Sequence, residues 1–152
     1  MILTSLLTPL LTPLALAGSA AFAGAAAYIN LSEQPARLSL DDVSLLREWK
    51  PSYARGLEMQ ATLALVSGLL GLAAFYFENH PAAAIGGVLL LANWPYTLWV
   101  MAPNNKALAA TADQDAGPAT RARIVLWGKL HAVRTALGIA GAGAFVAASF
   151  MN

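Results

Sequence analysis

The residues best suited to chemistry gather near the start of the last apolar segment of the chain. Trp127, His131 and Arg134 follow one another at spacings of four and three residues, so on a helix they share one face. This places an imidazole beside a permanent cation, and the cation favours a neutral ring that can accept a proton. Ionisable groups inside an apolar segment are costly, which makes His131 and Arg134 catalytic candidates by default.

Other polar and aromatic residues are expected near the same end of the molecule. Asn30, Glu33 and Arg37 would share a face if the first helix continued through Pro35. Glu33 is the third catalytic candidate, since it could orient the histidine or pair with Arg37. The remaining candidates are substrate-binding residues, and with Asn30 and Arg37 this group comprises Trp49, Tyr53, Asn93, Asn104 and Trp127.

Structural roles for several of these residues remain open. Trp49 and Tyr53 could belong to an aromatic belt at the membrane interface. Asn93 could be a hydrogen-bonding contact between helices. Glu33 and Arg134 could form a structural ion pair, because a buried charge needs a partner whatever the function.

Common cofactor and nucleophile motifs are absent from the sequence. The chain has no cysteine, and its two histidines, His80 and His131, are expected on opposite sides of the membrane. No metal site is therefore expected, and neither a phosphate-binding glycine loop nor a Ser-His-Asp pattern occurs. The net charge of +1 gives no indication of nucleic-acid binding. We expect chemistry without a cofactor.

Composition indicates an integral membrane protein. Of 152 residues, 58% are hydrophobic and 11% are charged, against roughly 25% charged in soluble domains. Four apolar segments, residues 8–30, 53–77, 81–102 and 124–150, are each long enough to cross a bilayer. The sequence predicts one all-α domain over residues 1–152, a four-helix up-and-down bundle in the lipid bilayer.

Local signals refine the boundaries of these helices. The first segment has no basic residue before it and is too long for a signal peptide, so we expect a retained helix that starts at Thr12-Pro13 or Thr8-Pro9. A short extra amphipathic helix is expected over residues 39–49, between the first two spanning helices. Small residues should allow close helix packing; the glycines concerned are Gly18, Gly24, Gly68, Gly71, Gly86, Gly87, Gly138, Gly141 and Gly143.

Basic residues predict the orientation. Residues 37–55 and 106–129 each hold four Lys or Arg, whereas the termini and the 78–80 turn hold none. The positive-inside rule therefore places both long connections in the cytoplasm and both termini outside, in the inner membrane if the source is bacterial. The sequence leaves open whether copies of the chain associate into a homo-oligomer.

The chain resembles the anthrone oxygenase-like family of small membrane proteins over nearly its whole length. The resemblance lies in four short helices that carry Asn30-x-x-Glu33-x-x-x-Arg37, Trp49-x-x-x-Tyr53, Pro103-Asn104 and Trp127-x-x-x-His131-x-x-Arg134. The Trp/His/Arg signature is its most specific part. The resemblance implies oxidation of anthrones to anthraquinones by molecular oxygen, without an obvious metal or flavin. Many bacterial members have no assigned role.

That chemistry suits the candidate residues. An anthrone has an acidic CH2 group, and its anion is electron-rich enough to react with oxygen directly. His131 could act as the base and Arg134 could hold the anionic oxygen, with Asn104 or Asn30 as a second donor. The aromatic residues could line an apolar slot for the substrate. The alternative is a non-enzymatic carrier, binding or accessory protein for an apolar aromatic or quinone-like ligand.

Overall fold

The computed structural model describes residues 8–150, and all regular structure in that range is helical. Four helical runs are long and apolar enough to cross a membrane: Thr8–Leu38, Asp42–Glu78, Pro81–Ala110 and Pro118–Ser149. This confirms the predicted all-α, membrane-spanning class.

Two of the four runs are interrupted. The first comprises η1 (Thr8–Leu10), α2 (Leu11–Tyr28), η2 (Ile29–Glu33) and α3 (Gln34–Leu38). The third comprises α5 (Pro81–Leu91), α6 (Asn93–Pro95), η3 (Tyr96–Met101) and α7 (Ala102–Ala110). The second and fourth runs are single helices, α4 (Asp42–Glu78) and α8 (Pro118–Ser149), and the short η4 (Asp113–Asp115) lies between α7 and α8.

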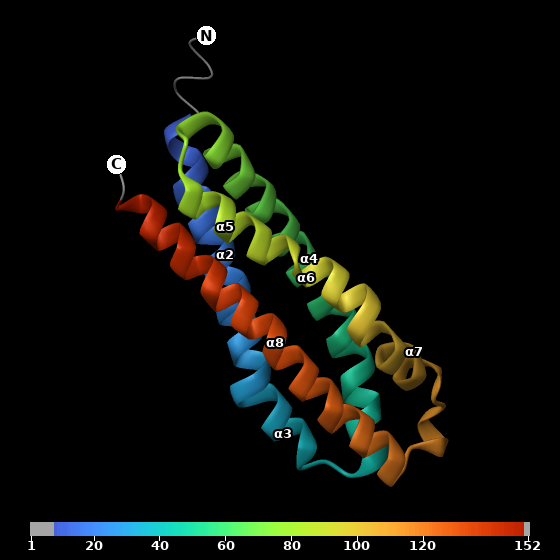
Figure 1. Ribbon diagram of the computed structural model, residues 1–152. Helices are drawn as coiled ribbons and strands as arrows, with labels where there is room; N and C mark the ends of the chain where they lie inside the picture. The colour runs from blue at the N-terminus through green and yellow to red at the C-terminus, as the bar shows by residue number, and fades with distance from the viewer. Residues whose placement is uncertain (1–7, 151–152) are drawn as a thin grey trace.

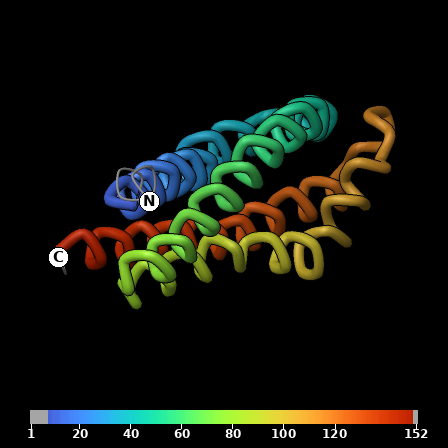
Figure 2. The backbone as a smooth tube through the Cα atoms, turned by 90° about the horizontal axis from the view of Figure 1, so that it is seen from above, coloured from blue at the N-terminus to red at the C-terminus, as the bar shows by residue number. Residues whose placement is uncertain are grey.

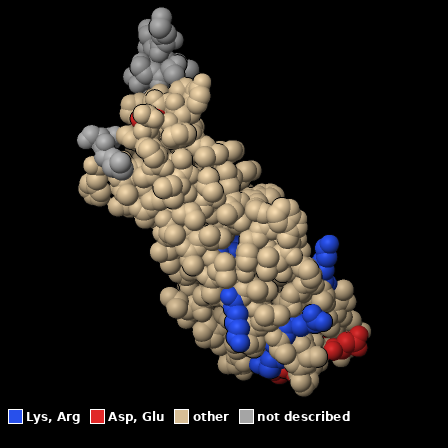
Figure 3. Space-filling view, in the orientation of Figure 1, with Lys and Arg blue, Asp and Glu red and all other residues tan. Residues whose placement is uncertain are grey.

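The four runs form an antiparallel bundle. Each of α2, α4, α5 and α8 packs along two neighbours, in the ring order α2, α4, α5, α8 (Figures 1 and 2). The described ends of the chain lie at one end of the bundle with the turn between α4 and α5 (Figure 1). Lys and Arg side chains gather toward the opposite end (Figure 3).

Glycines allow α4 and α5 to pack backbone against backbone. A Cβ atom on Gly87 would lie 2.8 Å from the carbonyl oxygen of Gly68, a distance that real Cβ atoms do not tolerate. The predicted role of glycine in helix packing is therefore confirmed here. It is wrong for Gly24 and Gly143, because a Cβ atom on either would meet nothing within 4 Å.

The helices differ from the predicted boundaries at the start of α4. The extra amphipathic helix does not form a separate element, because residues 42–50 are the first turns of α4 and Pro51 lies inside that helix. Pro51 deprives the carbonyl of Arg47 of its helical hydrogen bond, and both residues are exposed. Of the two starts predicted for the first helix, the helical run already includes Thr8-Pro9, and the hydroxyl of Thr12 donates to a carboxylate oxygen of Glu78 at 2.8 Å.

Both π turns of the described chain end shortly before a proline. η2 precedes Pro35, and η3 precedes Pro103. A proline ring clashes with the carbonyl four residues earlier, and the wider π turn gives that carbonyl room. The first run therefore continues through Pro35, as Asn30, Glu33 and Arg37 require if they are to share a face.

Candidate functional site

His131 is held by an amide from the first run. Its Nδ1 lies 2.8 Å from Oδ1 of Asn30, and the Nδ2 group of Asn30 donates to the carbonyl oxygen of Gly128 at 2.9 Å. Thr135 donates its hydroxyl to the same Oδ1 at 2.7 Å. Since this oxygen only accepts, Nδ1 of a neutral His131 carries the proton and Nε2 is left as the proton acceptor.

A small cavity with several polar lining residues lies beside the imidazole. It has a volume of about 10 Å³ and is lined in part by Glu33, Gln60, His131 and Arg134. Gln60 is buried, and neither atom of its amide has a hydrogen-bond partner. The volume is close to the room that one water needs, and a water there would find polar partners.

A larger cavity of about 200 Å³ lies between α4 and the third run. Its walls are mostly apolar, and Leu57, Ala61, Ala64 and Leu98 contribute to them. Tyr53, Leu57 and Arg134 line both cavities, so the two are neighbours that share one wall.

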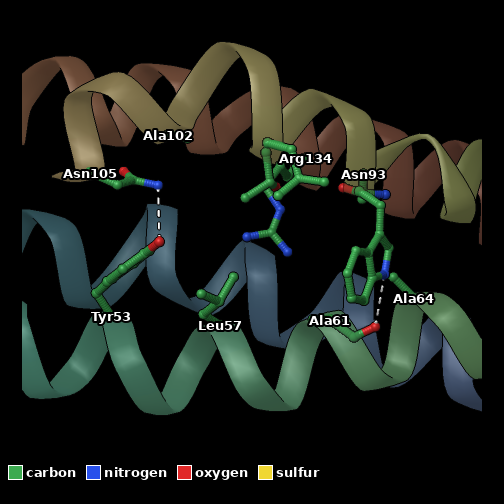
Figure 4. A pocket seen from close by; sticks show the side chains of 11 residues that line it. Tyr53, Leu57, Ala61, Ala64, Asn93, Ala102, Asn105 and Arg134 are labelled. Atoms are coloured by element: carbon green, nitrogen blue, oxygen red, sulfur yellow. Dashed lines mark hydrogen bonds between the residues drawn. The ribbon is translucent and has the colours of Figure 1, made fainter.

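Four polar side chains of the larger cavity have unpartnered atoms. These atoms are Oδ1 of Asn93, Oγ1 of Thr97, Oδ1 of Asn105 and Nε of Arg134. Asn105 also donates to the hydroxyl of Tyr53 at 3.1 Å, which joins α7 to α4 across the cavity (Figure 4). The arrangement is an apolar slot with a few convergent polar atoms, which is typical of small-molecule sites.

Arg134 is the only cation among the described residues that line this slot. Its side chain extends from α8 into the space between Tyr53 and Asn93 (Figure 4), and only 4% of the residue is exposed. Within residues 8–150 it has no carboxylate at ion-pair distance, and its guanidinium lies over the ring of Phe22 at 5.6 Å. A buried cation without a counter-ion favours an anionic ligand.

Arg37, the other buried arginine, is ion-paired within the protein. It pairs with Glu33, and its Nε lies 2.9 Å from a carboxylate oxygen of Glu48. Ser52 accepts from Arg37 at 3.0 Å and donates to Glu33. Of the two roles considered for Glu33, the structure therefore shows pairing with Arg37, while Asn30 orients His131. Glu33 and Arg134 do not form an ion pair.

Stacked rings connect α4 with the imidazole. Trp49 stacks on Tyr53 at a centroid distance of 4.7 Å, and its edge meets Trp127 at 6.0 Å. Trp127 stacks on His131 at 5.0 Å. Trp49 and Trp127 are buried, so they are not residues of an interfacial belt, and they support the site rather than line the larger cavity.

The structure places the predicted site residues in three groups. Tyr53, Asn93 and Arg134 line the larger cavity, and Glu33, Arg37, Trp127 and His131 line the smaller one together with Tyr53 and Arg134. Asn30, Trp49 and Asn104 line neither. Asn104 donates instead to the backbone oxygen of Arg123 at 3.1 Å, which ties α7 to α8.

Asn105, Gln60 and Thr97 also line the two cavities, although they are not among the predicted site residues. Gln60 lies seven residues after Tyr53 and so on the same face of α4, which was a usable signal. Asn105 adjoins Asn104 in the sequence, and helical spacing alone does not indicate which of the two side chains lines the cavity. Thr97 follows Asn93 by four residues, and this helical spacing was a usable signal as well.

No metal cluster is evident in the described part of the chain. Among residues 8–150, no three His, Asp or Glu side chains are placed to hold a metal ion together. The polar atoms of the larger cavity are amides, a hydroxyl and a guanidinium, which suit an organic ligand with an anionic oxygen.

Comparisons with known proteins agree on one family. Residues 49–144 match the family described as anthrone oxygenase. A curated anthrone oxygenase from Claviceps purpurea (strain 20.1) is 29% identical over 114 residues, an alignment that covers 67% of this chain and 66% of the relative. The chain thus spans just under two thirds of that relative's length. No solved structure matches.

Proposed function

This chain belongs to the anthrone oxygenase family, and we propose that it oxidises an anthrone-like aromatic substrate with molecular oxygen in the larger cavity. The observation that carries this proposal is the unpaired guanidinium of Arg134, buried in an otherwise apolar slot. An anthrone supplies what such a slot lacks, since it is flat and apolar and becomes an oxyanion when its CH2 group loses a proton.

The reaction balances without a further reactant. His131 accepts a proton from the CH2 carbon, and Arg134 stabilises the resulting enolate oxygen. The carbanionic carbon adds dioxygen and forms a peroxide, which recovers the proton from His131. Loss of water then leaves a carbonyl, so one CH2 group and one O2 become one C=O group and one H2O.

The proton reaches His131 through one water in the small cavity. His131 lines that cavity and not the larger one, while Arg134 lines both. Transfer through one water is within the geometry that general bases use. The hydrogen bond from Nδ1 to Asn30 keeps Nε2 as the accepting atom.

The position of His131 also favours the second candidate function. Because the imidazole lies outside the larger cavity, the same slot could bind a phenolate or quinone without reacting with it. The protein would then be a carrier or accessory protein for an apolar aromatic ligand.

Oxygen uptake separates the two functions. The purified protein in lipid, with metals chelated, should consume oxygen with an anthrone faster than the spontaneous reaction. His131→Ala should lose about 10²–10⁴-fold of that acceleration, whereas His80→Ala, at the other end of the bundle, should keep it. Equal rates for wild type and His131→Ala would contradict the base and favour the carrier.

We also propose that the basic end of the bundle faces the cytoplasm, with the bilayer as the constant partner of the protein. The support is the gathering of Lys and Arg at that end (Figure 3). A cysteine introduced at Asp115 should react from the cytoplasmic side and one at His80 from outside. Labelling of Asp115 from outside intact cells would reverse the orientation.

A further inference from the structure

We propose that the substrate enters the larger cavity sideways from the lipid bilayer, through a mouth covered by the side chain of Trp94. The nature of the ligand rests on the proposed function. Trp94 and the lateral entry route play no part in the oxidation itself, so both can be tested by measuring ligand binding alone.

The cavity meets the surface of the protein at Trp94 and Leu98. Both side chains line the cavity, yet they are 40% and 58% exposed. Both belong to the third membrane-spanning run, Pro81–Ala110. The surroundings of this mouth are therefore hydrocarbon, from which an apolar aromatic enters without crossing water.

Trp94 closes the mouth with one hydrogen bond. Its Nε1 donates to the carbonyl oxygen of Ala61 at 3.3 Å, which joins α6 to α4. The cavity of about 200 Å³ is smaller than the roughly 300–1,000 Å³ typical of ligand pockets. A three-ring ligand therefore needs extra room, and an outward rotation of the exposed indole supplies it.

The polar route into the site is too narrow for such a ligand. From the larger cavity it passes through the small cavity of about 10 Å³, which shares Glu33 and Ser52 with an open surface groove. That room suits one water, and an apolar ring there would strip water from the carboxylate of Glu33. In the described part of the chain, the aromatic ligand and the water formed in the reaction thus have separate paths.

The test is a binding experiment on the full chain in lipid nanodiscs. The probe is a fluorescent hydroxyanthraquinone, chosen because its phenolate oxygen suits Arg134 and it cannot be turned over. Stopped-flow binding is followed through the fluorescence of the probe while the amount of lipid is varied at constant total probe. If entry is lateral, the association rate should follow the probe-to-lipid ratio rather than the aqueous probe concentration.

Variants at Trp94 test the lid directly. Trp94→Phe removes the hydrogen bond and should raise both the association and dissociation rates about two- to tenfold, the factor that one net hydrogen bond is worth. Trp94→Ala should raise both rates further. The matched control is Trp99→Ala, because Trp99 is 78% exposed in the same run but does not line the cavity; its rates should equal those of wild type.

Each outcome decides the route separately from the oxidation. Unchanged rates in both Trp94 variants, or a rate that follows the aqueous probe concentration in wild type, would overturn the lateral mouth even if the protein consumes oxygen. Lateral binding without oxygen uptake would leave the mouth standing and remove the enzymatic function. Absence of saturable binding in wild type would overturn the mouth as well.

Discussion

Replacing Arg134 with methionine should weaken ligand binding and at the same time stabilise the ligand-free protein. Methionine fills a similar volume without a charge. A hydrogen bond between charged groups contributes about 1.5–3 kcal/mol, so affinity for an aromatic oxyanion should fall about ten- to 150-fold. A neutral analogue that lacks the oxygen should bind both proteins alike.

The expected gain in stability follows from the unpaired state of the guanidinium. A buried ion costs several kcal/mol after relaxation of its surroundings. The cation–π contact with the ring of Phe22 at 5.6 Å offsets about 0.5–2 kcal/mol of this burial cost. The free energy of unfolding should therefore rise by about 1–3 kcal/mol in Arg134→Met, as is common when a site residue is removed.

Titration with a denaturing detergent in mixed micelles measures this stability, and titration with a hydroxyanthraquinone measures the affinity. Arg134→Lys is the matched control, because it keeps the charge but loses the planar fork of donors. It should bind the oxyanion more weakly without becoming more stable. A marked loss of stability in Arg134→Met, with affinity unchanged, would show that Arg134 is a structural residue and refute the reasoning.

Three further predictions concern the surroundings of the site. Asn30→Leu should lower the rate of oxygen uptake about tenfold or more with little change in KM, because the Nδ1–H form of the imidazole is no longer favoured; an unchanged rate would contradict the role of Asn30. Gly87→Val should lower the free energy of unfolding by about 1–3 kcal/mol because its Cβ would strike the backbone of α4, whereas Gly24→Ala should have little effect; detergent titration compares the two. Hydrogen bonds from Lys50 and Arg47 lower the pKa of Asp113. The contribution of this carboxylate to the free energy of unfolding is therefore present above the ordinary carboxyl range and is lost as pH falls through the lowered pKa. The free energy of unfolding of Asp113→Asn, measured against pH, should lack this loss in acid.

The membrane-spanning class and the face shared by Trp127, His131 and Arg134 could be predicted from the sequence. Charge-free apolar segments specify the first, since too few polar residues exist to cover the helices in water. Helical spacing specifies the second. Spacing also brought Asn30, Glu33 and Arg37 together, but it could not tell which of them meets His131.

What the sequence could not supply is the rotation of each helix against its neighbours. Glu33 bonds Arg37 one turn away, and its partner Ser52 lies on α4. Asn30 lies about one turn earlier and reaches α8 instead. Which of Asn30 and Glu33 reaches His131 depends on η2, where one widened turn shifts the helical register. Helical periodicity does not describe such a turn.

The two π turns connect the irregular backbone with the site. η2 carries Asn30 and Glu33, and η3 carries Thr97 and Leu98. Irregular backbone at membrane depth is tolerated where protein or a cavity satisfies its polar groups. Both turns lie against the paired cavities, and each gives room to the carbonyl that lies four residues before a proline. The prolines at positions 35 and 103 thus favour the widened turns from which Asn30 reaches His131 and Thr97 lines the cavity beside Arg134.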